Sequence, residues 1–321
     1  MHLEENALRV YEQRKYPRDS FAARNPAQGV RLKSSSQKSN HSNYKDTKIA
    51  EVVNSMAMKR ILPVVLALFA SCLSASAQDW AKATLEKSPR HQEWVDIKHD
   101  NRVVHAFIVY PETKKKAPAV LVIHEIFGLT DWVRSVADKL AAQGYIAIAP
   151  DLLSGFGPEG KGSEGFASSQ DAMKAISGLD ADTITADLNA VADYVKKLPS
   201  ADGKLAVAGF CWGGGQSFRF ATNRPDLKAA FVFYGPPPKE FASIKAPVYG
   251  FYAGDDARIG ATLPDTQAAM KKAGKKYDPV TYEGAKHGFM RAGEDPSNTV
   301  EANKKAHDEG WQRWLLLLKK L

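Results

Sequence analysis

The chain has 321 residues, of which 44% are hydrophobic, so it is long enough to bury a sizeable core. Its formal charge of +8 at pH 7 comes mostly from the first 77 residues, and residues 78–321 carry only +2. Because the sequence also lacks a basic stripe interleaved with aromatic residues, this charge distribution argues against nucleic-acid binding.

Residues 58–77 are typical of a secretory signal peptide. Lys59 and Arg60 form a basic start, an apolar run follows from Ile61, and a small-residue cleavage site ends at Ala77. A membrane anchor is the alternative, but it needs an apolar run of about 20 residues, and this run is shorter. We therefore expect cleavage near Ala77 and export to the periplasm or the medium.

Residues 1–57 precede this segment and are rich in Ser, Asn, Lys and Arg, with hardly any apolar periodicity. We expect that translation starts at Met56 or Met58, so that this stretch is not part of the protein. A disordered leader is the alternative. In both cases the fold is expected in residues 78–321, as a single domain.

The rest of the chain alternates strand and helix patterns, which predicts an α/β fold with a mainly parallel sheet and helices on both faces. A continuous apolar run such as APAVLVIHE indicates a strand buried on both faces. Residues 154–169 are rich in Gly and Ser and are expected to form a long loop. The expected strands cover residues 94–98, 103–110, 117–125, 145–151, 204–210, 229–235, 246–254 and 276–284. The expected helices cover residues 131–144, 181–198, the stretch that ends near 222, 262–273, and the stretch from about 300 onward.

Cysteine usage directs attention to one residue. Cys72 leaves with the signal peptide, so the mature chain keeps only Cys211, in the stretch GFCWG between a strand and a helix. This stretch matches the Gly-x-nucleophile-x-Gly elbow, with cysteine in place of serine. The glycines leave room for a sharp turn, and the helix N-terminus is expected to favour the thiolate. A phosphate-binding glycine turn is the alternative, but the Gly-x-x-x-x-Gly-Lys-Ser/Thr motif is absent.

A nucleophile in such an elbow needs a base and an orienting acid, which follow it in the order acid, histidine. Downstream of Cys211 only His287 and His307 are found. His307 lies among charged residues of the final helix and is expected on the solvated surface, so His287, just beyond the last strand, is the better base. Asp255 and Asp256 both follow a strand, and spacing alone does not choose between them.

The end of the third expected strand offers the remaining parts of a hydrolase site. The loop after that strand supplies one backbone N–H for the oxyanion, and the residue after the nucleophile supplies the other, which predicts Ile126 and Trp212 as donors. His124 and Glu125 match the start of a zinc-binding His-Glu-x-x-His motif. The fifth residue is Gly128, so no metal site is expected.

The segments HEIFGL, APDLL, GFCWGGG, GDDAR and HGF, in this order and at these intervals, resemble the dienelactone hydrolase (carboxymethylenebutenolidase) family of α/β-hydrolases. The resemblance covers about residues 95–321. It implies the α/β-hydrolase fold and the hydrolysis of ester or lactone bonds.

The resemblance also implies roles for single residues. It implies Cys211 as the nucleophile, His287 as the base and Asp256, rather than Asp255, as the orienting acid. It makes Glu125 the residue that contacts the resting thiol and helps to deprotonate it when substrate arrives.

Arg291 and Tyr234 are expected to bind substrate. Arg291 matches a family arginine that binds the carboxylate of the dienelactone. The second arginine of that clamp would follow Asp151 and Leu152, where this chain has the residues LSGF at 153–156. A single cation weakens the case for a dienelactone as the substrate.

We therefore expect an exported hydrolase of small-molecule esters or lactones that works as a monomer or homodimer, without a metal, a cofactor or a membrane span. The alternative is a non-catalytic α/β-hydrolase scaffold that binds a small acid or a protein partner. A thiol-based redox protein is disfavoured, because the mature sequence has no resolving cysteine.

Overall fold

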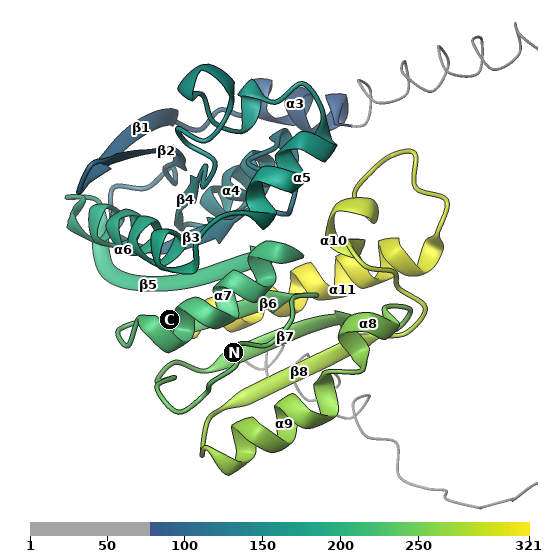
Figure 1. Cartoon of the computed structure of the whole chain (residues 1–321). Coiled ribbons are helices and arrows are strands. Elements are labelled where there is room, and N and C mark those ends of the chain that lie inside the picture. The colour runs from purple at the N-terminus through teal and green to yellow at the C-terminus, as the bar shows by residue number, and fades with distance from the viewer. Residues whose placement is uncertain (1–77) are drawn as a thin grey trace, which may run out of the picture. The chain divides into compact units, whose positions relative to one another are not determined.

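The computed structural model describes residues 78–321, so the expected signal peptide and the residues before it lie outside the described part. An eight-stranded sheet in the order β1-β2-β4-β3-β5-β6-β7-β8 runs through this part (Figure 1). Strand β2 is antiparallel to β1 and β4, and all the other neighbours are parallel. The strands are β1 Gln92–His99, β2 Arg102–Val109, β3 Ala117–Ile123, β4 Ile146–Pro150, β5 Ala201–Phe210, β6 Ala229–Phe233, β7 Val248–Ala253 and β8 Tyr277–Tyr282.

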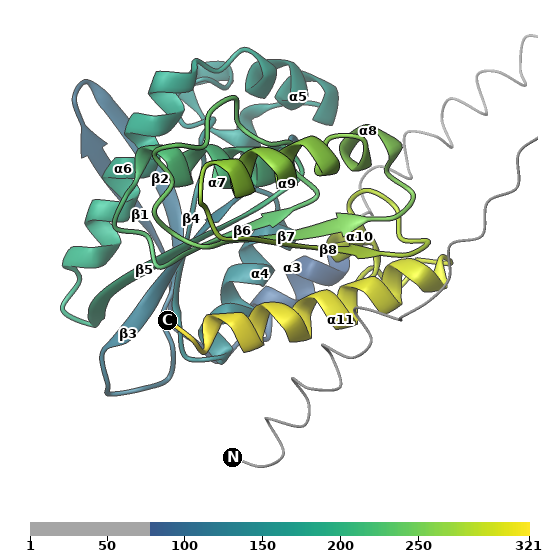
Figure 2. The same ribbon diagram turned by 90° about the horizontal axis from the view of Figure 1, so that it is seen from below.

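Helices cover both faces of this sheet, as the sequence predicts (Figure 2). Helices α3, α4 and α11 lie on one side, and α6, α7 and α9 lie on the other. The helices are α3 Asp79–Glu86, α4 Asp131–Ala142, α5 Ser169–Ser177, α6 Ala181–Lys197, α7 Trp212–Asn223, α8 Ala257–Gly260, α9 Leu263–Lys272, α10 Phe289–Ala292 and α11 Glu301–Leu318. None of these helices is long and apolar enough to cross a membrane.

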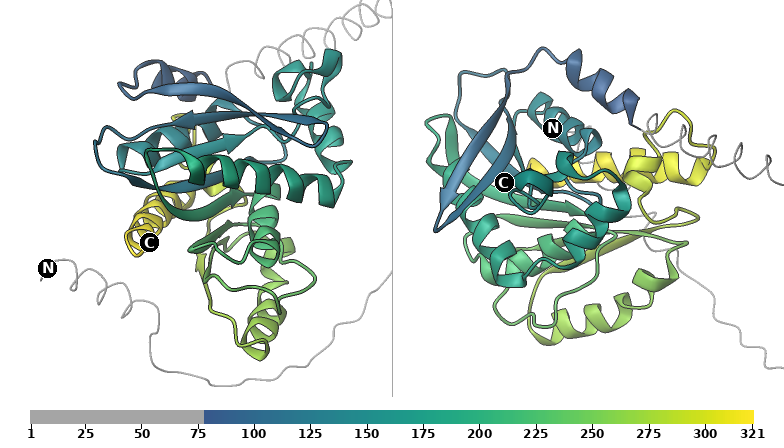
Figure 3. Two further views of the ribbon diagram at one scale, coloured as in Figure 1. Left: turned by 90° about the vertical axis from the view of Figure 1, so that its left-hand side faces the viewer. Right: turned by 45° about the horizontal axis from the view of Figure 1, so that its top comes forward.

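Each face of the sheet has its own hydrophobic cluster. Because successive side chains of a strand point to opposite faces, β3 gives Val120 and Val122 to the cluster under α4 and α11. It gives Leu121 and Ile123 to the cluster under α6 and α7. The continuous apolar run of β3 is thus explained by burial on both sides. The edges of the sheet, β1 and β8, lie far apart, as seen from the side (Figure 3).

Four helices were not predicted, and two of them, α8 and α10, are only four residues long. Of the other two, α3 precedes the first expected strand, and α5 follows the expected loop, which contains two single-turn 3₁₀ segments, Pro158–Gly160 and Ser163–Gly165. Both helices are short and have only two buried residues each: Ala81 and Leu85 in α3, and Ala172 and Ile176 in α5. With 8 and 9 residues these helices make little more than two turns, so their 3.6-residue period repeats too few times to stand out, although Ser168 does cap α5 by accepting the Asp171 N–H.

The predicted site residues follow the carboxyl ends of parallel strands. Glu125 comes after β3, Cys211 after β5, Tyr234 after β6, Asp256 after β7 and His287 after β8. In an open parallel sheet these ends lie at one edge, which is where such folds bind their ligands.

Candidate active site

The turn from β5 to α7 holds Cys211 in a backbone conformation that L-residues rarely adopt, with φ 56° and ψ −117°. Such a conformation costs on the order of 1–3 kcal/mol and persists only where its surroundings enforce it. The neighbouring glycines are required by close contacts. A Cβ on Gly209 would lie 2.0 Å from the Gly213 carbonyl oxygen, and one on Gly213 would lie 2.2 Å from the carbonyl oxygen of His124. The turn therefore presents the thiol at the start of α7.

The thiol of Cys211 is partly buried and is not in a disulfide. Burial, and then the nearby Glu125 carboxylate, raise its pKa, while hydrogen bonds from the backbone N–H groups of Trp212 and Ile126 lower it. The pKa is raised overall. The helix N-terminus does favour the thiolate, as expected, but desolvation and a neighbouring anion outweigh the N–H groups, so the neutral thiol is favoured overall.

His287 and Asp256 form a close pair. The Nδ1 atom of His287 lies 2.5 Å from Oδ2 of Asp256, and Oδ1 of this buried carboxylate accepts the N–H of Ile259 at 3.3 Å. With Nδ1 held by the carboxylate, Nε2 is the ring nitrogen left to exchange a proton. Asp255, by contrast, is exposed, and its backbone N–H donates to the carbonyl of Ala285. The structure thus brings Asp256, not Asp255, to the imidazole.

Tyr234 packs against the same imidazole. Its ring lies edge-on to that of His287, with 5.0 Å between the ring centroids, and its side chain is fully buried. Burial, and then Glu125 and Cys211, raise the pKa of Tyr234 well above its ordinary value, so the phenol stays neutral. Tyr234 therefore packs beside the imidazole, and the thiol and the Glu125 carboxylate are close enough to raise its pKa.

Glu125 and Arg291 form an ion pair. The Nε–H of Arg291 donates to Oε2 of Glu125 at 2.8 Å, and the side chain of Glu125 is only 2% exposed. Burial raises the pKa of Glu125, and the guanidinium opposes this shift. Arg291 also lies over the ring of Phe127, 5.6 Å from its centroid. The cation expected to bind substrate is thus paired with the carboxylate expected to act on the thiol.

Two histidines differ from their expected surroundings. His307 was expected to be solvated, but its side chain is only 18% exposed, because it packs beside Glu294 and Asp308. His124 was considered only as part of a zinc motif, yet it is fully buried and is bonded to two backbone groups of the site loops. Within residues 78–321 no three His, Cys, Asp or Glu side chains lie close enough to hold a metal ion.

A surface cavity of about 640 Å³ opens beside the loop that follows β3. Phe127, which contacts Arg291, is part of its wall. The cavity is lined further by Trp94, Leu129, Thr130, Arg134 and Ser163. It is thus adjacent to the Glu125–Arg291 pair.

The strand order, the strained turn after β5 and the histidine and carboxylate that follow β8 and β7 define an α/β-hydrolase. The sequence profile of the dienelactone hydrolase family matches residues 104–321. The chain belongs to this family, which is a family of enzymes.

Relatives and solved structures agree with this assignment. A protein of Methylorubrum extorquens assigned as a carboxymethylenebutenolidase is 32% identical over 233 residues, which cover 68% of this chain and 77% of that protein. One from Saccharolobus solfataricus with the same assignment is 33% identical over 67% of this chain and 93% of its own length. A crystal structure from Klebsiella pneumoniae assigned as a dienelactone hydrolase superposes with a TM-score of 0.63 and 27% identity, over 72% of this chain and 99% of that one.

Proposed function

We propose that this protein hydrolyses ester or lactone bonds of small molecules by means of a triad formed by Cys211, His287 and Asp256. One observation carries the proposal: Cys211 lies on a strained turn at the N-terminus of α7, where the backbone N–H groups of Trp212 and Ile126 act to lower the pKa of its thiol. N–H groups that favour negative charge at the nucleophile are well placed to bind the oxyanion that forms when this sulfur attacks a carbonyl.

In the proposed reaction, Glu125 first takes the proton of the thiol. The thiolate of Cys211 then attacks the carbonyl carbon, Ile126 and Trp212 stabilise the oxyanion, and the leaving oxygen takes the proton that Glu125 received. Water next attacks the thioester and gives a proton to Nε2 of His287, while Asp256 stabilises the resulting imidazolium. The acid departs, and the proton returns from His287 to the sulfur.

For Glu125 to accept the proton of the thiol in this reaction, the substrate must break the ion pair between Glu125 and Arg291. We propose that an acidic group on the substrate pairs with Arg291, which frees the Glu125 carboxylate to act on the neighbouring thiol. The ion pair supports this order of events, because in the resting site the carboxylate is engaged by the guanidinium and the thiol pKa is raised.

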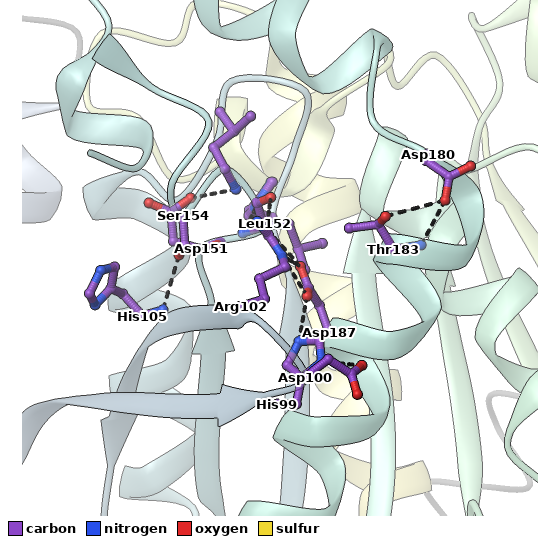
Figure 4. Close-up of polar contacts among 12 residues, drawn as sticks. His99, Asp100, Arg102, His105, Asp151, Leu152, Ser154, Asp180, Thr183 and Asp187 are labelled. Carbon is purple, nitrogen blue, oxygen red and sulfur yellow. Dashed lines mark hydrogen bonds and ion pairs between the residues drawn. The ribbon is translucent and has the colours of Figure 1, made fainter. Parts of the chain in front are cut away.

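A second cation for such a substrate is not available where the family has one. Arg102 does reach this turn, and its Nη2 lies 3.3 Å from the carbonyl oxygen of Leu152. It is held, however, by both carboxylate oxygens of Asp187 at 2.8–3.0 Å, and His99 binds the same aspartate at 2.7 Å (Figure 4). We therefore propose a substrate whose acidic group is bound by Arg291 without this second cation, which favours substrates other than a dienelactone.

The proposal is tested by comparing wild type and Cys211→Ala on p-nitrophenyl acetate and on a panel of lactones and esters with and without a carboxylate. We expect the variant to lose turnover, and we expect one equivalent of alkylating reagent to abolish wild-type activity. If Cys211→Ala hydrolyses these compounds at the wild-type rate, the triad is wrong. If neither protein hydrolyses any of them and both bind a small acid, the chain is a binding scaffold.

We further propose that the protein is exported after cleavage near Ala77. The pattern of residues 58–77 supports this proposal. Expression from Met58 in a Gram-negative host, fractionation and N-terminal sequencing test it. A periplasmic product that begins at Gln78 is expected, and a cytoplasmic product that retains these residues would contradict it.

A further inference from the structure

His124 lies directly after β3 and is bonded on both ring nitrogens. Nδ1 lies 2.7 Å from the carbonyl oxygen of Glu125, and the backbone N–H of Leu152 donates to Nε2 at 3.3 Å. A carbonyl only accepts and an N–H only donates, so Nδ1 must carry the proton and Nε2 must not. Two backbone groups thus select one neutral tautomer of a fully buried ring.

The bond to the Glu125 carbonyl sets the direction of the next N–H. The peptide group between Glu125 and Ile126 is planar and trans, so its C=O and N–H point in opposite directions. The Gly128 N–H donates to the same carbonyl at 3.3 Å. When His124 and Gly128 hold the C=O on one side, the Ile126 N–H is turned to the other side. That N–H is one of the two that act to lower the pKa of the Cys211 thiol.

The same ring also contacts the segment that carries the second donor. The His124 imidazole stacks on the indole of Trp212, with 5.5 Å between the ring centroids and 14° between the planes. The backbone carbonyl of His124 lies so close to Gly213 that a Cβ at this position would overlap it. One residue is therefore in contact with both backbone segments that supply N–H groups to the thiol.

We infer that His124 is a positioning residue for the oxyanion donors, because it orients the Ile126 N–H through the Glu125 carbonyl and supports Trp212 by stacking. This inference rests on the proposed function. The family resemblance assigns no role to His124. The hydrogen bond from the Leu152 N–H to His124 also connects this residue to the loop after β4.

The test compares three variants at position 124. His124→Phe keeps a ring that can stack on Trp212 but loses both hydrogen bonds. His124→Leu also loses them and lacks the ring. His124→Asn keeps a donor nitrogen near the position of Nδ1 and can still hold the Glu125 carbonyl. His91→Phe, at a mostly exposed histidine, is the matched control.

We expect kcat per active site to fall about 10²–10³-fold in His124→Phe and His124→Leu, which is the usual cost of losing one oxyanion donor. KM should change little. His124→Asn should keep most of the activity, and His91→Phe should resemble wild type. The active-site concentration is taken from the burst of p-nitrophenol, so that partly unfolded protein does not count.

A second readout does not depend on hydrolysis. Because the Ile126 N–H lowers the thiol pKa, its misorientation should raise that pKa in His124→Phe and His124→Leu but not in His124→Asn. The pH dependence of iodoacetamide alkylation of Cys211 measures it. Wild-type kcat and an unchanged alkylation profile in both donor-free variants would overturn the inference.

This outcome is distinguishable from failure of the proposed function. If Cys211→Ala is active while the alkylation profile shifts, the triad fails and the positioning role stands. If Cys211→Ala is inactive and neither readout changes at position 124, the triad stands and the positioning role fails. Should one donor-free variant not fold, the other still decides the comparison with His124→Asn.

Discussion

Opposing influences act on the ionisation of the Cys211 sulfur. The N–H groups of Trp212 and Ile126 favour the thiolate, whereas burial and the Glu125 carboxylate favour the thiol and prevail. A neutral resting thiol is a poor nucleophile but resists oxidation, since oxidation requires thiolate character. In the proposed mechanism the site therefore stays unreactive until an acidic substrate rearranges the Glu125–Arg291 pair.

Glu125→Gln tests the role of the carboxylate at this residue. Removal of the negative charge should lower the thiol pKa, so alkylation of Cys211 by iodoacetamide near pH 7 should become several-fold faster than in wild type. Ester turnover should fall, because the proposed proton acceptor is gone. Glu309→Gln, at an exposed position of α11, is the control. Slower or unchanged alkylation in Glu125→Gln would contradict this account.

The choice between two adjacent aspartates gives a second residue-level prediction. Asp256→Asn should lower kcat by about 10³–10⁴-fold, because the amide no longer holds Nδ1–H of His287 and no longer stabilises the imidazolium. Asp255→Asn, at the exposed neighbour, should retain nearly full activity. Steady-state kinetics of the two variants on the same ester decide the matter, and equal losses would show that the observed pair with His287 is not the functional one.

At the level of elements, β3 and α7 approach so closely that their contact leaves no room for a side chain. A Cβ on Gly213 would lie 2.2 Å from the carbonyl oxygen of His124 and 2.6 Å from that of Ile123. These atoms belong to backbone at the end of β3, so the strand and the helix must move apart to admit a methyl group.

Gly213→Ala should therefore reduce the free energy of unfolding by about 1–3 kcal/mol, a typical cost of overpacking. It should also lower kcat, because Trp212 is carried on the same helix end. Gly260→Ala is the matched control, since a Cβ at this position of α8 meets no atom within 4 Å. Urea unfolding of both variants measures the effect, and equal stabilities would show that the elements adjust without cost.

For the molecule as a whole, buried titratable groups between the site loops set how stability depends on pH. Burial lowers the pKa of His124 below its ordinary value of 6.5, while the nearby Asp151 carboxylate opposes this shift. The unfolded chain therefore binds a proton at this residue more readily than the folded chain does. The contribution of the neutral His124 ring to the free energy of unfolding is fully present above pH 6.5. It is lost as the pH falls from 6.5 toward the lowered pKa of the folded state.

Wild-type stability should thus decrease between pH 7 and pH 5 by up to about 1.4 kcal/mol per pH unit on account of this residue. His124→Asn has no group that titrates there, so its free energy of unfolding should depend less steeply on pH over the same range. His91→Asn should keep the wild-type slope. Urea unfolding at a series of pH values provides the comparison, and parallel curves for wild type and His124→Asn would refute the assignment.

The sequence by itself determined the main features of this protein. Apolar runs and helical periods predicted the eight strands and the long helices. Burial of one or both faces of an element fixes the spacing of its apolar residues, and this spacing can be read within one segment of the sequence. The glycines around Cys211 predicted the strained turn, since a local steric requirement is visible in adjacent residues. The short helices α3, α5, α8 and α10 were missed because a helix of one or two turns repeats its period too few times to stand out in the sequence.

Only the tertiary structure decided how the parts of the site act on one another. Glu125 and Arg291 are 166 residues apart in the chain, and no local pattern indicates that they pair. The raised pKa of Cys211, the burial of His307 and the two backbone bonds of His124 likewise depend on groups from different elements. Charge interactions and desolvation are set by distance in space and by exclusion of water, and the fold alone determines both.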